Sequence, residues 1–221
     1  MRFTLGASPC DDGAFPPTSP TMHDRLLDDF LDAFSSALSE VSPTHLADVW
    51  HVGGTRRRTA LYADLLGQVA TALGPEWVVK KEHCRIDFVL GKTIPLPGAK
   101  HDGIVPLIAV ESENMAPGAS NEVDNLCALA APVKVLITCA IWSRTPPSQD
   151  ARERLLDRWR SIHAAHVAAL PERAKDVFVV IVGERTRKGS TQRLRFFKEV
   201  LAGPGADSST LVDLVPPIDL P

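Results

Sequence analysis

Three acidic side chains stand at the ends of two apolar segments that are typical of neighbouring β-strands. Asp87 interrupts the segment RIDFVL, and Glu111 and Glu113 follow the apolar start of PLIAVESEN. Because side chains alternate along a strand, Glu111 and Glu113 are expected on one face of it, together with Leu107 and Ala109. Open α/β sheets commonly bind ligands at the carboxyl ends of their strands, so these acids are the first candidates for a site.

Pairing the apolar centres of the two strands antiparallel, with Leu90 opposite Ile108, sets their expected register. Asp87 then lies opposite Glu111, where Cβ atoms are about 4.5–5.5 Å apart. Two carboxylates at this separation repel each other unless a positive charge lies between them. A hard divalent cation such as Mg²⁺ or Mn²⁺ suits such oxygen ligands and can activate water for attack on a phosphate ester. The sequence therefore predicts a metal site formed by Asp87, Glu111 and Glu113.

A lysine on the preceding strand has two possible roles beside these acids. A two-residue turn at His83 and Cys84 would place Lys80 opposite Asp87. There its ammonium could stabilise the negative charge of a phosphoryl transition state, which makes Lys80 a candidate catalytic residue together with the three acids. The alternative is that Lys80 and Arg85 are simple counter-charges and the acids form an ordinary ionic cluster.

Hydrophobic periodicity divides the chain into alternating helices and strands. Apolar residues recur at helical spacing over 22–40, 55–73, 121–131 and 149–170. Five segments are typical of strands: EWVVKKE, RIDFVLG, PLIAVESEN, VKVLITCAIW and DVFVVIVGE. The Gly- and Pro-rich residues 91–106 and the segment TRKGSTQ are expected as connecting loops. Strands that are apolar on both sides belong in a sheet covered by helices on both faces. We therefore expect a three-layer α/β/α sandwich with a mixed sheet.

The composition fits one globular domain. The chain has 221 residues, 44% of them hydrophobic and 23% charged, and a net charge of −3, which excludes fibrous and largely disordered proteins. Residues 22–203 are expected to form a single α/β domain between a flexible tail over 1–21 and a C-terminal tail over 204–221. We find no apolar run of membrane-spanning length and no secretory signal, so we expect a cytoplasmic protein without membrane contacts.

The order of these elements, with RIDFVL and IAVESEN on consecutive strands, resembles the PD-(D/E)xK nuclease superfamily. The resemblance runs from the helix at 55–73 to the last apolar strand and implies a restriction-endonuclease-like αβββαβ core. In that family an Asp on the second strand and a Glu on the third bind Mg²⁺, which implies these roles for Asp87 and Glu111. The family has a water-assisting Lys two residues after the Glu, and here that position holds Glu113. Lys80 is then the best-placed substitute.

Three further residues are placed by the order of the elements. Glu122 and Asn125 lie about one turn apart on the helix after the acidic strand and are expected to reach back toward the acids. Lys134 opens the next strand, which should run parallel to the acidic one, so it is expected at the opposite end of the sheet.

Two groups of basic residues could contact a nucleic-acid backbone. Three arginines open the helix at 55–73 directly after two glycines, where backbone N–H and guanidinium groups can meet a phosphate. Six basic residues lie between positions 185 and 198. The alternative interpretation is a solvated first helical turn for the three arginines and a polar hairpin loop for the six later residues. The candidate nucleic-acid contacts are Arg56, Arg57, Arg58, Arg185, Arg187 and Lys188.

Together these observations predict a Mg²⁺-dependent nuclease-like hydrolase that cleaves phosphodiester bonds of nucleic acid and grips the backbone without reading its sequence. The alternative is a catalytically degenerate module of the same fold that binds nucleic acid or a protein partner. A third interpretation, an α/β enzyme with unrelated chemistry in the 91–106 loop, has no motif to support it.

Overall fold

The computed structural model describes residues 21–51, 54–98, 100–142, 148–188, 190–203, 206 and 211–221. The expected N-terminal tail over 1–21 therefore lies outside the described residues, apart from Thr21. Within the described ranges, no helix has the length and apolar character that crossing a membrane requires.

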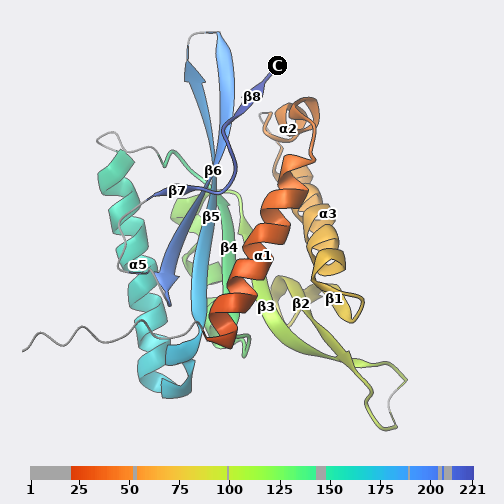
Figure 1. Cartoon of the computed structure of the whole chain (residues 1–221). Coiled ribbons are helices and arrows are strands. Elements are labelled where there is room, and N and C mark those ends of the chain that lie inside the picture. The colour runs from red at the N-terminus through yellow and green to blue at the C-terminus, as the bar shows by residue number, and fades with distance from the viewer. Residues whose placement is uncertain are drawn as a thin grey trace, which may run out of the picture.

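Helices and strands alternate along the chain much as the periodicity predicts (Figure 1). The described helices are α1 (Met22–Ser39), α2 (Pro43–Val49), α3 (Thr55–Leu73), α4 (Ser120–Ala128) and α5 (Ser148–Ala169), with 3₁₀ turns η1 (Ala116–Gly118) and η2 (Pro171–Lys175). The described strands are β1 (Trp77–His83), β2 (Ile86–Ile94), β3 (Gly103–Glu113), β4 (Val133–Cys139), β5 (Val177–Lys188), β6 (Thr191–Ala202), β7 (Val212–Asp213) and β8 (Ile218–Leu220).

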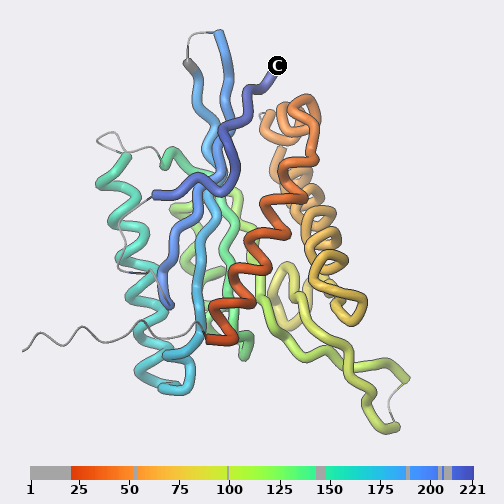
Figure 2. The backbone as a smooth tube through the Cα atoms, viewed as in Figure 1, coloured from red at the N-terminus to blue at the C-terminus, as the bar shows by residue number. Residues whose placement is uncertain are grey.

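The strands form one mixed sheet in the order β1-β2-β3-β4-β5-β6-β7, with β8 also paired to β6. Strands β1, β2 and β3 pair antiparallel, β3, β4 and β5 pair parallel, and β6 returns antiparallel to β5. Helices α1, α2 and α3 cover one face, and α4 and α5 cover the other (Figures 1 and 2). The expected three-layer α/β/α sandwich with a mixed sheet is thus confirmed.

Each face of the sheet has its own apolar core. Ile108 and Val110 pack in the core under α1–α3, and Ala109 packs in the core under α4 and α5, as strand alternation predicts. Leu107 was expected to share the face of Ala109 and instead packs with the α1–α3 core. Leu107 is the extra residue of a bulge, because Leu90 pairs with Ile108 while Gly91 pairs with Pro106.

Local signals in the sequence account for where the N-terminal helices begin. Thr21 caps α1 through a reciprocal pair of hydrogen bonds, in which Thr21 Oγ1 accepts from Asp24 N and Asp24 Oδ2 accepts from Thr21 N, at 3.3 and 2.7 Å. Helix α2 was not expected, although Ser42 caps it and Pro43 occupies its first turn. Seven residues give too little periodicity for a helix to be recognised.

Three segments that were expected as loops or tail contribute residues to the sheet. Strand β2 continues to Ile94 and β3 begins at Gly103, so the 91–106 loop is mostly an extended β-hairpin that projects from the body (Figure 1). The segment TRKGSTQ likewise contributes to β5 and β6, and part of the expected C-terminal tail pairs with β6. These segments become strands because they pair with residues that are distant in the sequence, and such pairing cannot be predicted from local composition.

Gly91 is expected to be intolerant of any side chain, because a Cβ atom there would lie 2.0 Å from the backbone oxygen of Val105. We expect Gly91→Ala to lower the free energy of unfolding by about 1–3 kcal/mol, since the bulge backbone must move. Urea unfolding measures this change. The matched control is Gly67→Ala in α3, where a Cβ meets nothing within 4 Å. It should stabilise by about 0.5–1 kcal/mol, and equal effects of the two substitutions would contradict the prediction.

Candidate functional site

The register of β2 and β3 is the one expected from their apolar centres, with Leu90 opposite Ile108. Continuing this register brings Asp87 beside Glu111, and the backbone N–H of Asp87 donates a hydrogen bond to Glu111 Oε2 at 3.3 Å. Two acids far apart in the sequence therefore meet at the carboxyl end of β3.

The Asp87 carboxylate, however, does not point straight across at that of Glu111. Asp87 Oδ2 accepts hydrogen bonds from Ser112 N at 3.0 Å and from Ser112 Oγ at 2.8 Å. Ile86 and Phe88 pack in the cores of opposite faces, so the alternation of β2 slips around Asp87. This slip brings Asp87 to Ser112, a contact that sequence reasoning missed.

Glu111 is almost completely buried, with 3% of its surface exposed. Desolvation raises the pKa of its carboxyl from 4.5 to about 8, and the neighbouring charge of Asp87 adds to the rise. The charge of Glu122 acts in the same direction, while a hydrogen bond with the side chain of Asn125 opposes it. The expectation that Glu122 and Asn125 of α4 reach the acids is thus confirmed.

We call Asp87, Glu111 and Glu122, with Asn125, the acidic cluster. Glu122 Oε2 is a buried carboxylate oxygen without a hydrogen-bond partner in the structure. The largest influences on the pKa of Glu111 are its burial and the neighbouring charge of Asp87, which both raise it. Burying carboxylates together without a counter-charge is unfavourable, and the burial of Glu111 is therefore best compensated by a proton or a bound cation.

Glu113, which was expected to join Asp87 and Glu111 at a metal, makes a different contact. Its Oε1 atom accepts a hydrogen bond from the backbone N–H of Met115 at 2.9 Å. The carboxylate thereby closes the turn that follows β3.

The expected position of Lys80 opposite Asp87 is wrong. Lys80 pairs with Val89, because the turn between β1 and β2 is formed by Cys84 and Arg85 rather than by His83 and Cys84. Cys84 and Arg85 have φ values of 55° and 66°. Tight hairpin turns of the primed kind need positive φ at both central residues and usually contain Gly or Asn, so this sequence does not reveal the turn.

Arg58 is the basic residue that the structure ties most directly to this end of the sheet. Its Nε atom donates to Asn114 Oδ1 at 2.6 Å, directly after β3. Burial raises the pKa of the nearby Cys139 thiol, and the charge of Arg58 opposes that rise. Arg56 and Arg57 are exposed on the first turn of α3. Asn114 was not singled out from the sequence, although it ends the polar run that marks the carboxyl end of β3.

The structure places two of the three basic residues that were expected to contact nucleic acid from the β5–β6 hairpin. Arg185 donates to the backbone oxygen of Trp50 at 2.7 Å and also contacts Gln192 Oε1, so it fastens the hairpin to the end of α2. Arg187 lies two residues further along β5. Lys188 ends β5, and its side chain lies outside the described residues.

The donor atoms of the acidic cluster suit the divalent cation that the nuclease resemblance implies. Its donors are hard carboxylate oxygens and an amide oxygen, the ligand types that Mg²⁺ and Mn²⁺ prefer, and the unpartnered oxygen of Glu122 is available. Across the described ranges, no three His, Cys, Asp or Glu side chains already converge as ligands of one metal ion. The donor chemistry fits a cation, and binding one requires side chains such as Asp87 to reorient.

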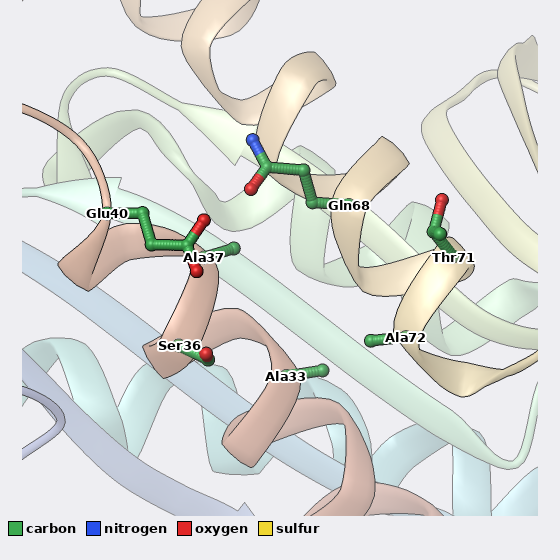
Figure 3. Close-up of a pocket in the computed structure, with 7 residues that line it drawn as sticks. All are labelled: Ala33, Ser36, Ala37, Glu40, Gln68, Thr71 and Ala72. Atoms are coloured by element: carbon green, nitrogen blue, oxygen red, sulfur yellow. The ribbon is translucent and has the colours of Figure 1, made fainter.

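A separate shallow pocket lies between α1 and α3, on the outer side of the helical layer (Figure 3). It has a volume of about 290 Å³ and contains no residue of the acidic cluster. The lining residues are Ala33, Ser36, Ala37, Glu40, Gln68, Thr71 and Ala72. Small and uncharged side chains predominate there, so the pocket offers little chemistry.

Comparison with known proteins adds no family. No protein-family model and no curated protein matches the chain. The central domain of yeast acetyl-CoA carboxylase is similar with 11% identity and a TM-score of 0.37, over 92% of this chain and 32% of that one. A carbon-nitrogen hydrolase from Helicobacter pylori G27 is similar with 7% identity and a TM-score of 0.29, over 90% and 85% of the two chains. This chain thus spans about a third of the carboxylase domain's length.

Proposed function

We propose that this protein is a Mg²⁺- or Mn²⁺-dependent phosphodiesterase that acts on nucleic acid. The observation that carries the proposal is the burial of Glu111 beside the charges of Asp87 and Glu122 at the carboxyl end of β3. A divalent cation would remove the repulsion between these carboxylates. Once bound, it would supply an activated water and screen the charge of the phosphate.

The surroundings of the acidic cluster support a phosphate-bearing substrate. Arg58, held by Asn114, places a guanidinium just beyond the strand end that carries Glu111. Arg56 and Arg57 extend the positive charge along the exposed first turn of α3. Guanidinium groups bind phosphate oxygens well and do not by themselves distinguish one base from another.

Cleavage assays on plasmid, single-stranded DNA and RNA in Mg²⁺ and Mn²⁺ test the proposal. Glu111→Gln should lower the cleavage rate by at least about 10–100-fold. A loss of this size is typical even when the replaced residue only hydrogen-bonds a metal ligand. Glu153→Gln is the matched control, since Glu153 lies on the exposed surface of α5, where its Oε1 atom accepts a hydrogen bond from Gln149. Metal-dependent cleavage that is lost only in Glu111→Gln would support the proposal, and equal cleavage by all three proteins would contradict it.

A second candidate function is a nucleic-acid-binding module without catalysis. It is favoured by the contact of Glu113 with its own turn and by the pairing of Lys80 with Val89, which leave the family's lysine position without a replacement beside Asp87. Under this alternative, folded wild-type protein binds nucleic acid and leaves it intact in both metals.

A further inference from the structure

The C-terminal residues 211–221, which we call the C-terminal strap, contact two arginines of β6. Arg195 Nε and Nη2 donate to the two carboxylate oxygens of Asp213, at 3.0 and 2.6 Å. Arg193 Nε donates to Asp219 Oδ1 at 2.7 Å. Strands β7 and β8 hold these aspartates in place by pairing with β6. Two carboxylates of the strap therefore neutralise two neighbouring guanidinium groups.

These arginines face the same side of the sheet as the acidic cluster. The guanidinium of Arg195 lies over the ring of Phe197, 4.5 Å from its centroid, and Phe197 packs in the core under α4 and α5. Leu194, between Arg193 and Arg195, packs in the opposite core. The acidic cluster is completed by residues of α4, on the side that Phe197 faces.

The arginines also lie toward the same end of the sheet. The strand register aligns Glu113 with Thr138 of β4, Thr138 with Val182 of β5, and Val182 with Phe197 of β6. Arg195 lies two residues beyond Phe197, in the carboxyl direction of the parallel strands. Three strand spacings and a few residues of rise put Arg195 roughly 20 Å from Glu111, a span of about six nucleotides along one strand of a duplex.

We infer that Arg193 and Arg195 form an interaction surface for the nucleic-acid backbone. The C-terminal strap covers this surface, because Asp213 and Asp219 bind the two guanidinium groups where phosphate groups would otherwise bind. The inference rests on the proposed function. It extends the substrate path from the acidic cluster across β4 and β5 to the edge of the sheet.

The ion pairs of the strap are suited to exchange. The Arg193 and Asp219 side chains are 44% and 60% exposed, and those of Arg195 and Asp213 are 33% and 35% exposed. The more exposed Arg193–Asp219 pair is weak, whereas the bidentate Arg195–Asp213 pair is the stronger of the two. Phosphate oxygens can replace either carboxylate, because they bind a guanidinium in the same geometry. The strap itself stays anchored, because Val215 and Leu220 are buried in the core under α1–α3. Only the charged contacts need to change partners.

The test is fluorescence anisotropy with a labelled duplex of about 20 base pairs, in EDTA so that cleavage does not occur. The variant Asp213→Asn/Asp219→Asn should bind roughly threefold to tenfold more tightly than wild type at about 100 mM salt, because two guanidinium groups become available to phosphates. Its slope of log affinity against log salt should steepen by up to about 1.8, for two added phosphate contacts.

Two further variants make the result specific. Asp29→Asn/Asp32→Asn changes the net charge equally on the exposed surface of α1 and should leave affinity near that of wild type. Arg193→Gln/Arg195→Gln should weaken binding in the wild-type background, because it removes two phosphate contacts and leaves Asp213 and Asp219 unpaired, and it should abolish the gain of the aspartate variant. A thermal melt of each variant establishes that it is folded.

The outcomes separate this inference from the proposed function. Unchanged affinity in the aspartate variant, or an equal gain in the α1 control, would overturn the role of the strap, whether or not the wild type cleaves nucleic acid. A gain that depends on Arg193 and Arg195 would support it. If that gain occurs in a protein that cleaves no nucleic acid in Mg²⁺ or Mn²⁺, the proposed phosphodiesterase activity is contradicted. The proposed nucleic-acid surface under the strap is then still supported.

Discussion

Glu111→Gln is expected to stabilise the metal-free protein at about pH 8.5 by about 2–4 kcal/mol. The wild-type carboxyl must ionise there while buried beside Asp87 and Glu122, whereas an amide carries no charge. The pKa of Glu111 is about 8 in the folded protein against an ordinary value of 4.5. A shift of this size corresponds to at most about 5 kcal/mol, and relaxation of the cluster reduces the realised effect.

The sign of the pH dependence follows from the raised pKa of Glu111. Between pH 4.5 and about 8 the folded wild type binds a proton that the unfolded chain has released, so its stability falls as pH rises through this window. The gain from Glu111→Gln should therefore be small near pH 4.5 and level off above pH 8. Urea unfolding in EDTA across this range measures it, with Asp29→Asn as the control. Stability curves of wild type and Glu111→Gln that run parallel would refute the prediction.

Asp176→Ala is expected to have the largest destabilising effect, about 3–5 kcal/mol at neutral pH. Lys134 at the start of β4 is 1% exposed, and its Nζ atom bonds the Asp176 carboxylate and the backbone oxygen of Ala131, at 2.8 Å in the latter case. Removing Asp176 leaves a buried ammonium with a single neutral acceptor. The location also agrees with the expectation that Lys134 lies at the opposite end of the sheet from the acidic cluster.

The pH dependence of Asp176→Ala gives a specific signature. Burial lowers the pKa of Lys134 from 10.5 even beside Asp176, so without its partner the ammonium should lose its proton at a still lower pH. The deficit of the variant should then shrink as pH rises, because the neutral amine tolerates burial. The double variant Lys134→Met/Asp176→Leu should recover most of the stability at neutral pH. A deficit below about 1 kcal/mol, or one that is the same at every pH, would argue against this account.

The part of the site that could be predicted depends on regular patterns of apolar residues along whole strands and helices. The apolar centres of β2 and β3 identify their register, because sliding either strand by one residue would turn its apolar side chains to the wrong face. That register alone brings Asp87 to Glu111, and helical spacing brings Glu122 and Asn125 to the same place. The order of apolar segments likewise predicted the three layers and the mixed sheet.

The part that could not be predicted depends on local departures from regularity. The turn at Cys84 and Arg85 contains neither Gly nor Asn, so no residue signals positive φ, and Lys80 moves from Asp87 to Val89 as a result. The slip of alternation between Ile86 and Phe88 arises from tertiary packing. In the C-terminal strap, prolines at 216, 217 and 221 divide the apolar residues into pieces too short to show a period, and only the pairing with β6 reveals the strap as part of the sheet.

The projecting hairpin of β2 and β3 has a consequence for how the protein meets other copies of itself. Strand β1 pairs with β2 as far as Lys92 and β4 pairs with β3 only from Ile108, so the hairpin beyond them has its own two strands alone. It also exposes apolar side chains, with Ile94 39% and Val105 40% accessible. An open ribbon of this kind is a template for intermolecular strand addition and aggregation. Pro106 within β3 lacks the N–H that an incoming strand would need, and Pro95 and Pro97 follow directly after the end of β2, so the prolines limit strand addition along this ribbon.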